Sequence, residues 1–442
     1  MEQIFNPRQS GAAGDGVTWD TAAIQRAIDQ AGKAAGEGKR PVVLLEKGTY
    51  LTSSLFLKSH MEFRMEEGAV LLGTTDESKY PILPTRVAGI EMEWPVGILN
   101  INGQKDVKVT GKGCIDGQGP YWWKKYWGED EKGGMRKLYD AKDLRWCVDY
   151  DCRRVRNLVV MDSEDVELSG FESRRSGFWN IHVCYSRQVH IDGLSIYDNA
   201  GPSTDGIDID SSEHVVVERC RIACNDDSIC VKSGRDADGL RVNRPCRDVR
   251  IQDCQILTGC GVTIGSETSG GIKGITVRNL KYRGTDCGFR VKSAKTRGGI
   301  IEDVLVENLE MVNVKYPFNM CLNWHPAYSY CRIPEGYEGE IPAHWKVLTA
   351  PVVPAEKGIP QVKNLVIRNV AAWNEPDYEG PSRAFEVDAF PEKPMINVVL
   401  EHVKIQAKEF GRLSGIRDWK WNDVEISAEW RNDTANDQYD MR

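Results

Sequence analysis

The chain has 442 residues, of which 41% are hydrophobic and 28% are charged, a composition that excludes an intrinsically disordered protein. Its formal charge of −8 makes nucleic acid an unsuitable ligand. The longest aliphatic runs, such as Pro41–Leu45, are far too short to span a bilayer. We therefore expect a globular protein with neither a nucleic-acid partner nor a membrane partner.

The first predicted element is a helix near the N-terminus. Thr18 or Asp20 can cap it, and Gly36–Gly38 should end it. Apolar residues follow the helical spacing of three and four, at Ile24, Ala27, Ile28 and Ala31. The preceding residues lack the basic and apolar regions of a secretory leader. The sequence thus leaves open a periplasmic or secreted protein whose leader was removed, and a cytoplasmic protein.

After this helix, short alternating apolar runs replace helical periodicity. One strand phrase, which ends in a small polar turn, recurs at variable spacing. Its four copies are Gly206–Ser211, Ser228–Ser233, Gly261–Ser266 and Gly288–Ser293. A fixed strand phrase with loops of different length suits stacked parallel coils, whereas hairpins would show more two-residue turns containing glycine.

We therefore predict an all-β fold, a single-domain right-handed parallel β-helix over residues 1–442. Residues 1–40 would form a cap that includes the helix, because an open last coil would expose unpaired backbone groups. Residues from about 45 to 430 would form the coils and their loop insertions. Equal positions of the four phrases should stack as an inward column, formed by Ile207, Ile229, Val262 and Phe289.

Cysteine usage indicates interior thiols. The chain has 13 cysteines, an odd number, so at least one is free or pairs between chains. No two of them have the C-x-x-C spacing of a zinc ribbon. Several lie within strand-like runs, for example Cys220 and Cys254, where cysteine behaves as a small buried hydrophobe.

Carboxylates gather where two of the strand phrases begin. Asp205 and Asp227 occupy the same position of successive phrases, and Asp226 lies beside them. Because stacked strands lie about 4.8 Å apart, the three carboxylates should repel one another and raise at least one pKa. A glycosidase needs such a pair of one protonated acid and one ionised base.

Cations lie further along the same strand phrase. Arg290 and Lys292 should project from the same side of the sheet as the carboxylates, where they would suit a carboxylate of the substrate. Taken singly, each motif has an ordinary alternative, since Asp-Asp is a common turn and a strand face is often solvated. Their convergence on one place favours a functional site.

These motifs resemble glycoside hydrolase family 28, the polygalacturonase family. The matching segments are Ser203-Thr204-Asp205-Gly206, Asn225-Asp226-Asp227, Gly259-Cys260-Gly261 and Arg290-Val291-Lys292. The start of the chain, from Gly14 to Ile24, is similar to the family's N-terminal cap. The segments Ser233–Gly239 and Ile264–Glu267 resemble its bacterial exo-acting branch.

The resemblance implies a pectin-lyase-like β-helix that hydrolyses α-linked galacturonic acid by single displacement with inversion. Asp226 would be the general acid, while Asp205 and Asp227 would hold and deprotonate the attacking water. Arg290 and Lys292 would bind the uronate carboxylate. No cofactor or metal would be required, the partner would be a pectic oligosaccharide or polysaccharide, and we expect a monomer.

The sequence departs from the family pattern at two positions. Ser203 stands where the family has asparagine, and Cys260 stands where polygalacturonases carry a histidine. Hydrolysis stays chemically possible, because carboxylates perform the proton transfers. We expect exo action on oligosaccharides with a terminal α-galacturonic acid and little activity on long unbranched polygalacturonate. The alternative substrate is a rhamnogalacturonan-type or other uronate-containing linkage.

Four further residues are candidates for substrate binding. His182 aligns one coil before Asp208 and would face the cleft or lie at the surface. Arg235 and Arg244 flank a long loop and would close one end of the cleft or be solvated. His325, in a non-repeating insertion, would contact substrate or be an ordinary loop residue. The aromatic segment Tyr121–Trp127 is expected in a loop that walls the cleft or packs locally.

Two functions other than hydrolysis are compatible with the predicted fold. A polysaccharide lyase on the same fold would use calcium and a basic residue, and would give an unsaturated product that absorbs ultraviolet light. A non-catalytic carbohydrate-binding or adhesin β-helix would show no turnover and would not require the carboxylates at Asp205, Asp226 and Asp227.

Overall fold

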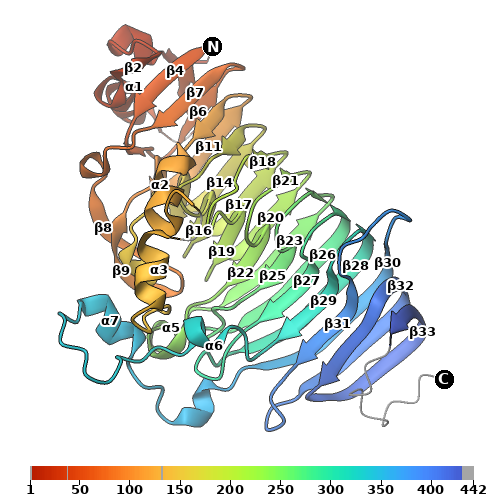
Figure 1. Ribbon diagram of the computed structural model, residues 1–442. Helices are drawn as coiled ribbons and strands as arrows, with labels where there is room; N and C mark the ends of the chain where they lie inside the picture. Colours follow the sequence, from red (N-terminus) through yellow and green to blue (C-terminus); the bar gives the residue numbers. More distant parts are fainter. Residues whose placement is uncertain (1, 37, 131–132, 431–442) are drawn as a thin grey trace. The chain divides into compact units, whose positions relative to one another are not determined.

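The computed structural model describes residues 2–36, 38–130 and 133–430 (Figure 1). The chain forms two compact units. Unit 1 comprises Met1–Val87, Glu91–Ala141 and Val148–Asp226, and unit 2 comprises Ala88–Ile90, Lys142–Cys147 and Asp227–Arg442. The single domain expected over residues 1–442 stays a prediction, and its last twelve residues, 431–442, lie outside the described part.

The predicted capping helix lies near the start of unit 1. The helix α1 (Thr21–Ala34) follows β1 (Ile4–Phe5), the 3-10 helix η1 (Pro7–Ser10) and β2 (Asp15–Trp19). Asp20 is the N-cap residue, and its carboxylate accepts hydrogen bonds from the backbone N–H groups of Ala13 and Gly14, at 2.7 and 2.9 Å. The predicted apolar face is buried, which confirms the helix and the side on which it packs.

Three ladders of parallel strands make the body of unit 1. The first contains β5 (Leu55–Phe56), β10 (Leu99–Asn102), β13 (Leu158–Met161), β16 (Ile181–Cys184) and β19 (Ile207–Asp210). The second contains β3 (Val42–Leu45), β6 (Met61–Met65), β11 (Lys105–Gly111), β14 (Glu164–Ser169), β17 (Arg187–Asp192) and β20 (Glu213–Glu218). The third contains β4 (Gly48–Thr52), β7 (Ala69–Gly73), β12 (Cys114–Asp116), β15 (Glu172–Arg174), β18 (Ser195–Tyr197) and β21 (Arg221–Ile222). Successive strands of the chain enter the ladders in turn, so unit 1 is a parallel β-helix, as predicted.

Unit 2 continues this pattern with longer strands. One ladder contains β22 (Ile229–Lys232), β25 (Val262–Ile264), β27 (Cys287–Lys292), β29 (Tyr316–Cys321) and β31 (Arg383–Asp388). The other contains β23 (Cys246–Gln252), β24 (Gln255–Ile256), β26 (Ile272–Arg283), β28 (Ile300–Val312), β30 (Gln361–Trp373), β32 (Met395–Ser414) and β33 (Ile416–Trp430). Figure 1 shows the last five of these as successive long arrows.

The long strands of unit 2 bend at asparagine. Asn279, Asn308 and Asn369 have φ values of 57°, 56° and 53°, in the left-handed region that asparagine tolerates better than most residues. Their side chains form a ladder, because Asn308 donates to Asn279 at 2.9 Å and Asn369 donates to Asn308 at 3.0 Å. The amide stack therefore fixes the same corner in three successive coils.

An apolar column runs through the interior of unit 2. The strand register aligns Ile229 with Val262, Val262 with Phe289, Phe289 with Phe318, and Phe318 with Phe385, and all five side chains are buried. The first three are residues that the sequence placed in one inward column, so their register is confirmed. The rings of Phe318 and Phe385 are stacked, with centroids 5.7 Å apart.

Replacing Phe318 by leucine should lower the stability of unit 2 by about 1 kcal/mol, because the aromatic stack is lost while most of the apolar volume remains. Thermal unfolding followed by circular dichroism measures the shift. The half-buried Tyr316 of the same strand supplies the control, since Tyr316→Leu should shift the midpoint less. Equal midpoints for Phe318→Leu and the wild type would contradict an ordered core at this column.

Helices outside the cap occur in the insertions. Unit 1 has η2 (Glu77–Lys79), α2 (Gly119–Trp127), α3 (Gly134–Asp140) and α4 (Val148–Asp151), and unit 2 has α5 (Asp236–Val242), α6 (Pro326–Ser329), α7 (Ala343–Leu348) and η3 (Ala355–Gly358). The strands β8 (Ile82–Val87) and β9 (Ile90–Pro95) form a separate two-stranded sheet. The aromatic segment predicted as a loop is thus the helix α2, in which Trp122 and Tyr126 are buried. Within the described residues, no helix has the length and apolar character needed to cross a membrane.

Candidate active site

The strand register of unit 2 brings the predicted cations together with one predicted carboxylate. Thr263 of β25 lies in register with Arg290 of β27. Arg290 and Lys292 are two residues apart on one strand and therefore share a face. Both side chains reach Asp227, which directly precedes the strand phrase of β22. The structure thus confirms that these cations and this carboxylate converge.

Asp227 is buried and receives several polar contacts. The ammonium of Lys292 lies 2.6 Å from Oδ2, the Thr263 hydroxyl donates to Oδ1 at 2.7 Å, and Arg290 donates to Oδ1 at 3.4 Å. Burial alone would raise the pKa of Asp227. The positive charges of Lys292, Arg290 and Lys232 outweigh this effect and hold the pKa well below its ordinary 3.8. Asp227 is therefore an anion at neutral pH. We expected repulsion among the three carboxylates to raise the pKa of at least one of them, and Asp227 is not that one.

A second group of charges belongs to the same electrostatic network. Lys232 lies 3.2 Å from Glu267, and both side chains are buried. Burial raises the pKa of Glu267, but the charges of Lys232, Arg297, Lys292 and Arg235 lower it to well below its usual range. Asp236 pairs with Arg235 at 2.7 Å and with Arg297 at 3.0 Å.

We call these residues the charge cluster of unit 2. It comprises Asp227, Asp236, Glu267, Lys232, Arg235, Arg290, Lys292 and Arg297. Its five cations outnumber its three carboxylates, and when the half-buried Asp226 is counted, whose carboxylate lies within 4.8 Å of that of Asp227, the formal surplus is one positive charge. A local surplus of this sign, in a chain with a net charge of −8, suits a ligand that carries carboxylates.

Trp324 lies over the two cations that contact Asp227. Its ring centroid is 4.5 Å from the Lys292 ammonium and 5.7 Å from the Arg290 guanidinium carbon. His325 follows it, is exposed, and meets the Trp324 ring edge-on at 5.4 Å. His325 also accepts a hydrogen bond at 3.3 Å from the backbone of Tyr328 at the start of α6. The predicted His325 therefore lies next to an aromatic ring that borders the cationic site.

The two loop arginines have different surroundings. Arg235 is completely buried, donates to the Ser329 carbonyl at 3.2 Å and lies over the Tyr328 ring at 5.1 Å. Protein groups surround the guanidinium of Arg235, so the expectations of a solvated side chain and of a direct contact with substrate are wrong, while closure of one end of the cleft stays a prediction. Arg244 is exposed on the loop between α5 and β23, where solvent reaches it.

The other two predicted carboxylates belong to unit 1. Asp205 is buried on the loop that precedes β19, and its carbonyl accepts hydrogen bonds from the backbone and the side chain of Asn180, at 2.9 and 3.0 Å. Asp226 is half-buried in the turn after β21. It is covalently adjacent to Asp227, the first residue of the main segment of unit 2.

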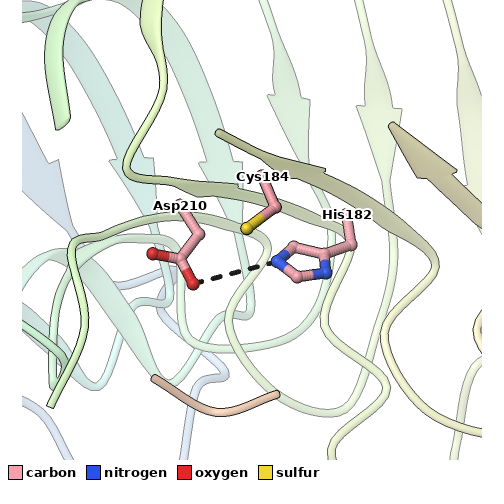
Figure 2. A group of neighbouring side chains, drawn as sticks. All are labelled: His182, Cys184 and Asp210. Carbon is pink, nitrogen blue, oxygen red and sulfur yellow. Dashed lines mark ion pairs between the residues drawn. The ribbon is translucent and has the colours of Figure 1, made fainter. Parts of the chain in front are cut away.

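His182 is in the predicted register but lies in a different environment. It aligns with Asp208, as expected, yet it is completely buried in unit 1. Arg156 contacts its Nδ1 at 2.7 Å, and Nε2 points toward Asp210 at 3.9 Å (Figure 2). Because a guanidinium only donates hydrogen bonds, Nδ1 accepts and the ring proton lies on Nε2. The expectation that His182 faces an open cleft is wrong, since arginine and aspartate enclose its ring.

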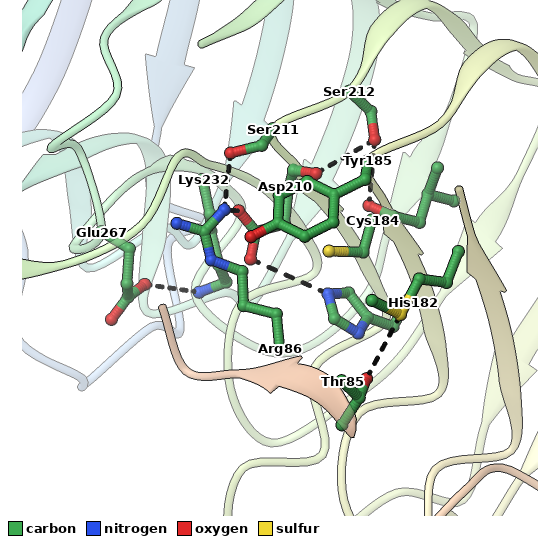
Figure 3. A network of polar contacts seen from close by, with 12 residues as sticks. Thr85, Arg86, His182, Cys184, Tyr185, Asp210, Ser211, Ser212, Lys232 and Glu267 are labelled. Atoms are coloured by element: carbon green, nitrogen blue, oxygen red, sulfur yellow. Dashed lines mark hydrogen bonds and ion pairs between the residues drawn. The ribbon is translucent and has the colours of Figure 1, made fainter. Parts of the chain in front are cut away.

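A buried polar network surrounds His182. Arg86 donates to Asp210 at 3.2 Å and to the Ser211 hydroxyl at 2.7 Å (Figure 3). Burial raises the pKa of the neighbouring Cys184 well above its ordinary value, so this residue is a neutral thiol. His182, Cys184 and Asp210 offer ligand atoms within 4.8 Å of one another, but Nδ1 of His182 accepts from Arg156, and the proton on Nε2 leaves the ring no second lone pair for a metal ion.

Sequence reasoning missed several residues of the site. Thr263 and Lys232 occupy positions of the repeated strand phrase, so the same alignment that selected Arg290 and Lys292 could have found them. Glu267 ends the segment Ile264–Glu267, which was identified only by its resemblance to the exo-acting branch. Trp324 directly precedes His325, which was predicted as a site residue. The sequence did not show which side chains of different coils form ion pairs, because one strand phrase taken alone does not reveal contacts between coils.

Known proteins resemble this chain along most of its length. The family "Glycosyl hydrolases family 28" matches residues 88–331, more than half of the chain, and "Rhamnogalacturonase A/epimerase, pectate lyase-like" matches residues 4–76. A "Probable polygalacturonase" of Vitis vinifera is 28% identical over 404 residues, which are 89% of this chain and 72% of the relative. The "Exo-poly-alpha-D-galacturonosidase" of Dickeya chrysanthemi is 26% identical over 71% of this chain and 56% of its own.

A solved structure agrees with the fold. The "Family 28 Exopolygalacturonase" of Yersinia enterocolitica aligns with a TM-score of 0.79 and 25% identity, over 98% of this chain and 76% of its own. The parallel ladders, the carboxylate motifs and the family match over residues 88–331 lead to one conclusion. The chain belongs to glycosyl hydrolase family 28 and is a glycoside hydrolase.

Proposed function

We propose that this enzyme releases α-linked galacturonic acid from the end of pectic oligosaccharides by inverting hydrolysis. The observation that carries the proposal is the cationic surplus at Asp227, where Arg290 and Lys292 share one face of β27. A cationic site in an acidic protein attracts an anionic sugar locally rather than through the overall field. A site that reads one uronate suits exo action better than a long groove.

The three motif carboxylates divide the proton transfers between them. Asp226 gives its proton to the glycosidic oxygen as the bond from that oxygen to the anomeric carbon breaks. Asp205 and Asp227 hold the attacking water, whose oxygen bonds to the opposite face of this carbon and whose proton passes to the base. The low pKa of Asp227 keeps it an anion that can accept a hydrogen bond from the water but makes it a weak base, so Asp205 would take the proton.

Other residues would recognise the sugar. We assign the uronate carboxylate to Arg290 and Lys292, because a guanidinium and an ammonium each carry a positive charge and several N–H donors. Trp324 offers an aromatic face beside them, while His325 and Arg244, which are exposed, would contact flanking sugar units. His182 and Arg235, being buried, act through their protein contacts.

Three observations favour end-trimming of short chains. The relatives from Dickeya and Yersinia are named as exo-acting enzymes, and Cys260 replaces the histidine of polygalacturonases. We further propose a monomer that works in the periplasm or outside the cell, where pectic polymers are found. A rhamnogalacturonan-type linkage is the alternative substrate, and the short match over residues 4–76 favours including it in the test.

The decisive experiment is product analysis with size-defined oligogalacturonates, long polygalacturonate and rhamnogalacturonan fragments. We expect monomeric galacturonic acid from the first product onward, with oligogalacturonates consumed faster than the polymer. A collapse of polygalacturonate viscosity before monomer appears would contradict exo action. Cleavage of only the rhamnogalacturonan fragments would reassign the substrate, and an unsaturated product would indicate a lyase.

Replacing Arg290 by alanine should raise KM for oligogalacturonates at least about tenfold, because a charged hydrogen bond to the substrate is lost. Initial rates over a range of substrate concentrations measure this effect. The exposed Arg250 of β23 supplies the control, and Arg250→Ala should leave KM unchanged. An Arg290→Ala enzyme with the wild-type KM would refute the assignment of the uronate site.

A further inference from the structure

We infer that Arg154 is a positioning residue for catalysis, whose guanidinium fixes the loop that carries Asp205. The inference rests on the proposed function, because it assumes that Asp205 takes part in hydrolysis. Arg154 lies between α4 and β13 in unit 1 and is completely buried. A buried arginine needs a reason for its desolvation, and the contacts of Arg154 supply one.

The guanidinium bonds directly to the residues before Asp205. One terminal nitrogen donates to the Pro202 carbonyl at 2.5 Å, and the other lies 3.4 Å from the Ser203 hydroxyl. The second nitrogen also donates to the Asp149 carboxylate at 3.1 Å. The Ser203 hydroxyl donates to the same carboxylate at 3.3 Å. Arg154 and Asp149 thus hold Ser203 between them.

The held loop has a conformation that it would not keep unaided. Ser203 has a φ of 53°, a left-handed conformation that costs a residue with a side chain free energy unless its surroundings enforce it. Thr204 donates its hydroxyl to the carbonyls of Asn199 and Gly201, at 2.9 and 2.8 Å. The contacts of Arg154 therefore hold Ser203 in this conformation, and the position of Ser203 determines where Thr204 and Asp205 lie.

The helical insertion of unit 1 holds Arg154 in place. The guanidinium carbon lies 4.5 Å from the Tyr126 ring centroid and 4.7 Å from that of Phe178. Tyr126 belongs to α2 and packs in an apolar cluster with Val148 and Cys152. Arginine suits this place because a guanidinium has a flat face and forked donors, which an ammonium group lacks.

Replacing Arg154 by lysine keeps the charge and removes the fork and the flat face. We expect kcat on oligogalacturonates to fall about tenfold to a hundredfold, since misplacing a reacting group by about 1 Å can cost this much. KM should change less than about threefold, because the sugar contacts of unit 2 are untouched. The exposed neighbour Arg153 supplies the matched control, and Arg153→Lys should behave as the wild type.

Hydrogen exchange with mass spectrometry gives a readout independent of turnover. Amides of residues 199–206 should exchange faster in Arg154→Lys than in the wild type or Arg153→Lys, while the strands β13 and β16 stay protected. Should Arg154→Lys fail to fold, Asp149→Asn tests the clamp that Arg154 and Asp149 form around Ser203. We expect this variant to show a smaller loss of kcat and the same faster exchange in residues 199–206. Wild-type kcat in the folded variant, or a loss of kcat without faster exchange in this loop, would overturn the inference. A wild-type enzyme inactive on every oligogalacturonate would instead refute the proposed function, and the exchange comparison would still test the clamp.

Discussion

Replacing Asp226 by asparagine is expected to lower kcat at least about a hundredfold, the usual contribution of a general acid. Asparagine has nearly the same shape but carries no proton that it can give to the leaving oxygen. Because Asp226 is half-buried, the change should leave the thermal midpoint almost unaltered. Initial rates on an oligogalacturonate, together with thermal unfolding, measure both effects.

Asp286 offers a matched control for this variant. It occupies the same position of the strand phrase in another coil, is exposed, and pairs with Lys315 at 3.3 Å, so Asp286→Asn should keep full activity. Near-normal turnover by Asp226→Asn would show that another group protonates the leaving oxygen. Proton NMR of the first product gives a second check, since inversion predicts the β-anomer from an α-linked substrate.

Replacing Lys292 by methionine should cost about 3–5 kcal/mol of folding free energy, the usual result of removing one partner of a buried ion pair. The ammonium lies 2.6 Å from the buried Asp227 carboxylate, and methionine fills the same space without compensating that charge. The variant should also lose most of its turnover, because the pKa of Asp227 would rise. Urea unfolding at neutral pH and initial rates measure the two losses.

The same variant should change how stability depends on pH. In the wild type the pKa of Asp227 lies below its ordinary 3.8, so its stabilising contribution is complete above this value and disappears as the pH falls through the lower folded pKa. Without Lys292 the folded pKa moves upward toward the unfolded value, so the window in which Asp227 loses stability narrows, and acid should destabilise the variant less than the wild type. Unfolding midpoints between pH 3 and pH 7 test this difference.

Lys281→Met is the control for Lys292→Met. Lys281 is exposed and lies 3.6 Å from Glu310 at the surface, where an ion pair contributes about 0–1 kcal/mol. Equal stability losses for the two variants would mean that the pair between Lys292 and Asp227 is no stronger than a surface contact.

Much of the fold could be predicted because it depends on repetition. The column formed by Ile229, Val262 and Phe289 followed from aligning one strand phrase, since equal positions of stacked coils must share a face. The helix α2 was missed because its many aromatic residues masked a start signal, the proline that stands at its second position. Insertions such as this one do not repeat, so alignment gives no information about them.

The site was harder to predict wherever burial decides the role. Convergence of Arg290, Lys292 and Asp227 followed from the phrase, but the resulting low pKa of Asp227 required the actual distances. His182 and Arg235 were predicted to contact substrate because residues that enclose them lie far away in sequence. Arg156 encloses the imidazole from 26 residues away, and Ser329 accepts from Arg235 across 94 residues.

The cysteines of this enzyme, which form no disulfide bonds, can report how it unfolds. All 13 are free thiols, ten of them buried and the other three only partly accessible. Burial raises the pKa of Cys114 and of Cys287 to about 12, so an alkylating reagent, which attacks the thiolate, finds almost no thiolate at these two residues in the native state. Because each coil of a solenoid contacts only its neighbours, a thiol becomes reactive when its own coil opens. Mapping alkylated cysteines during a urea titration would therefore give the order in which the coils open.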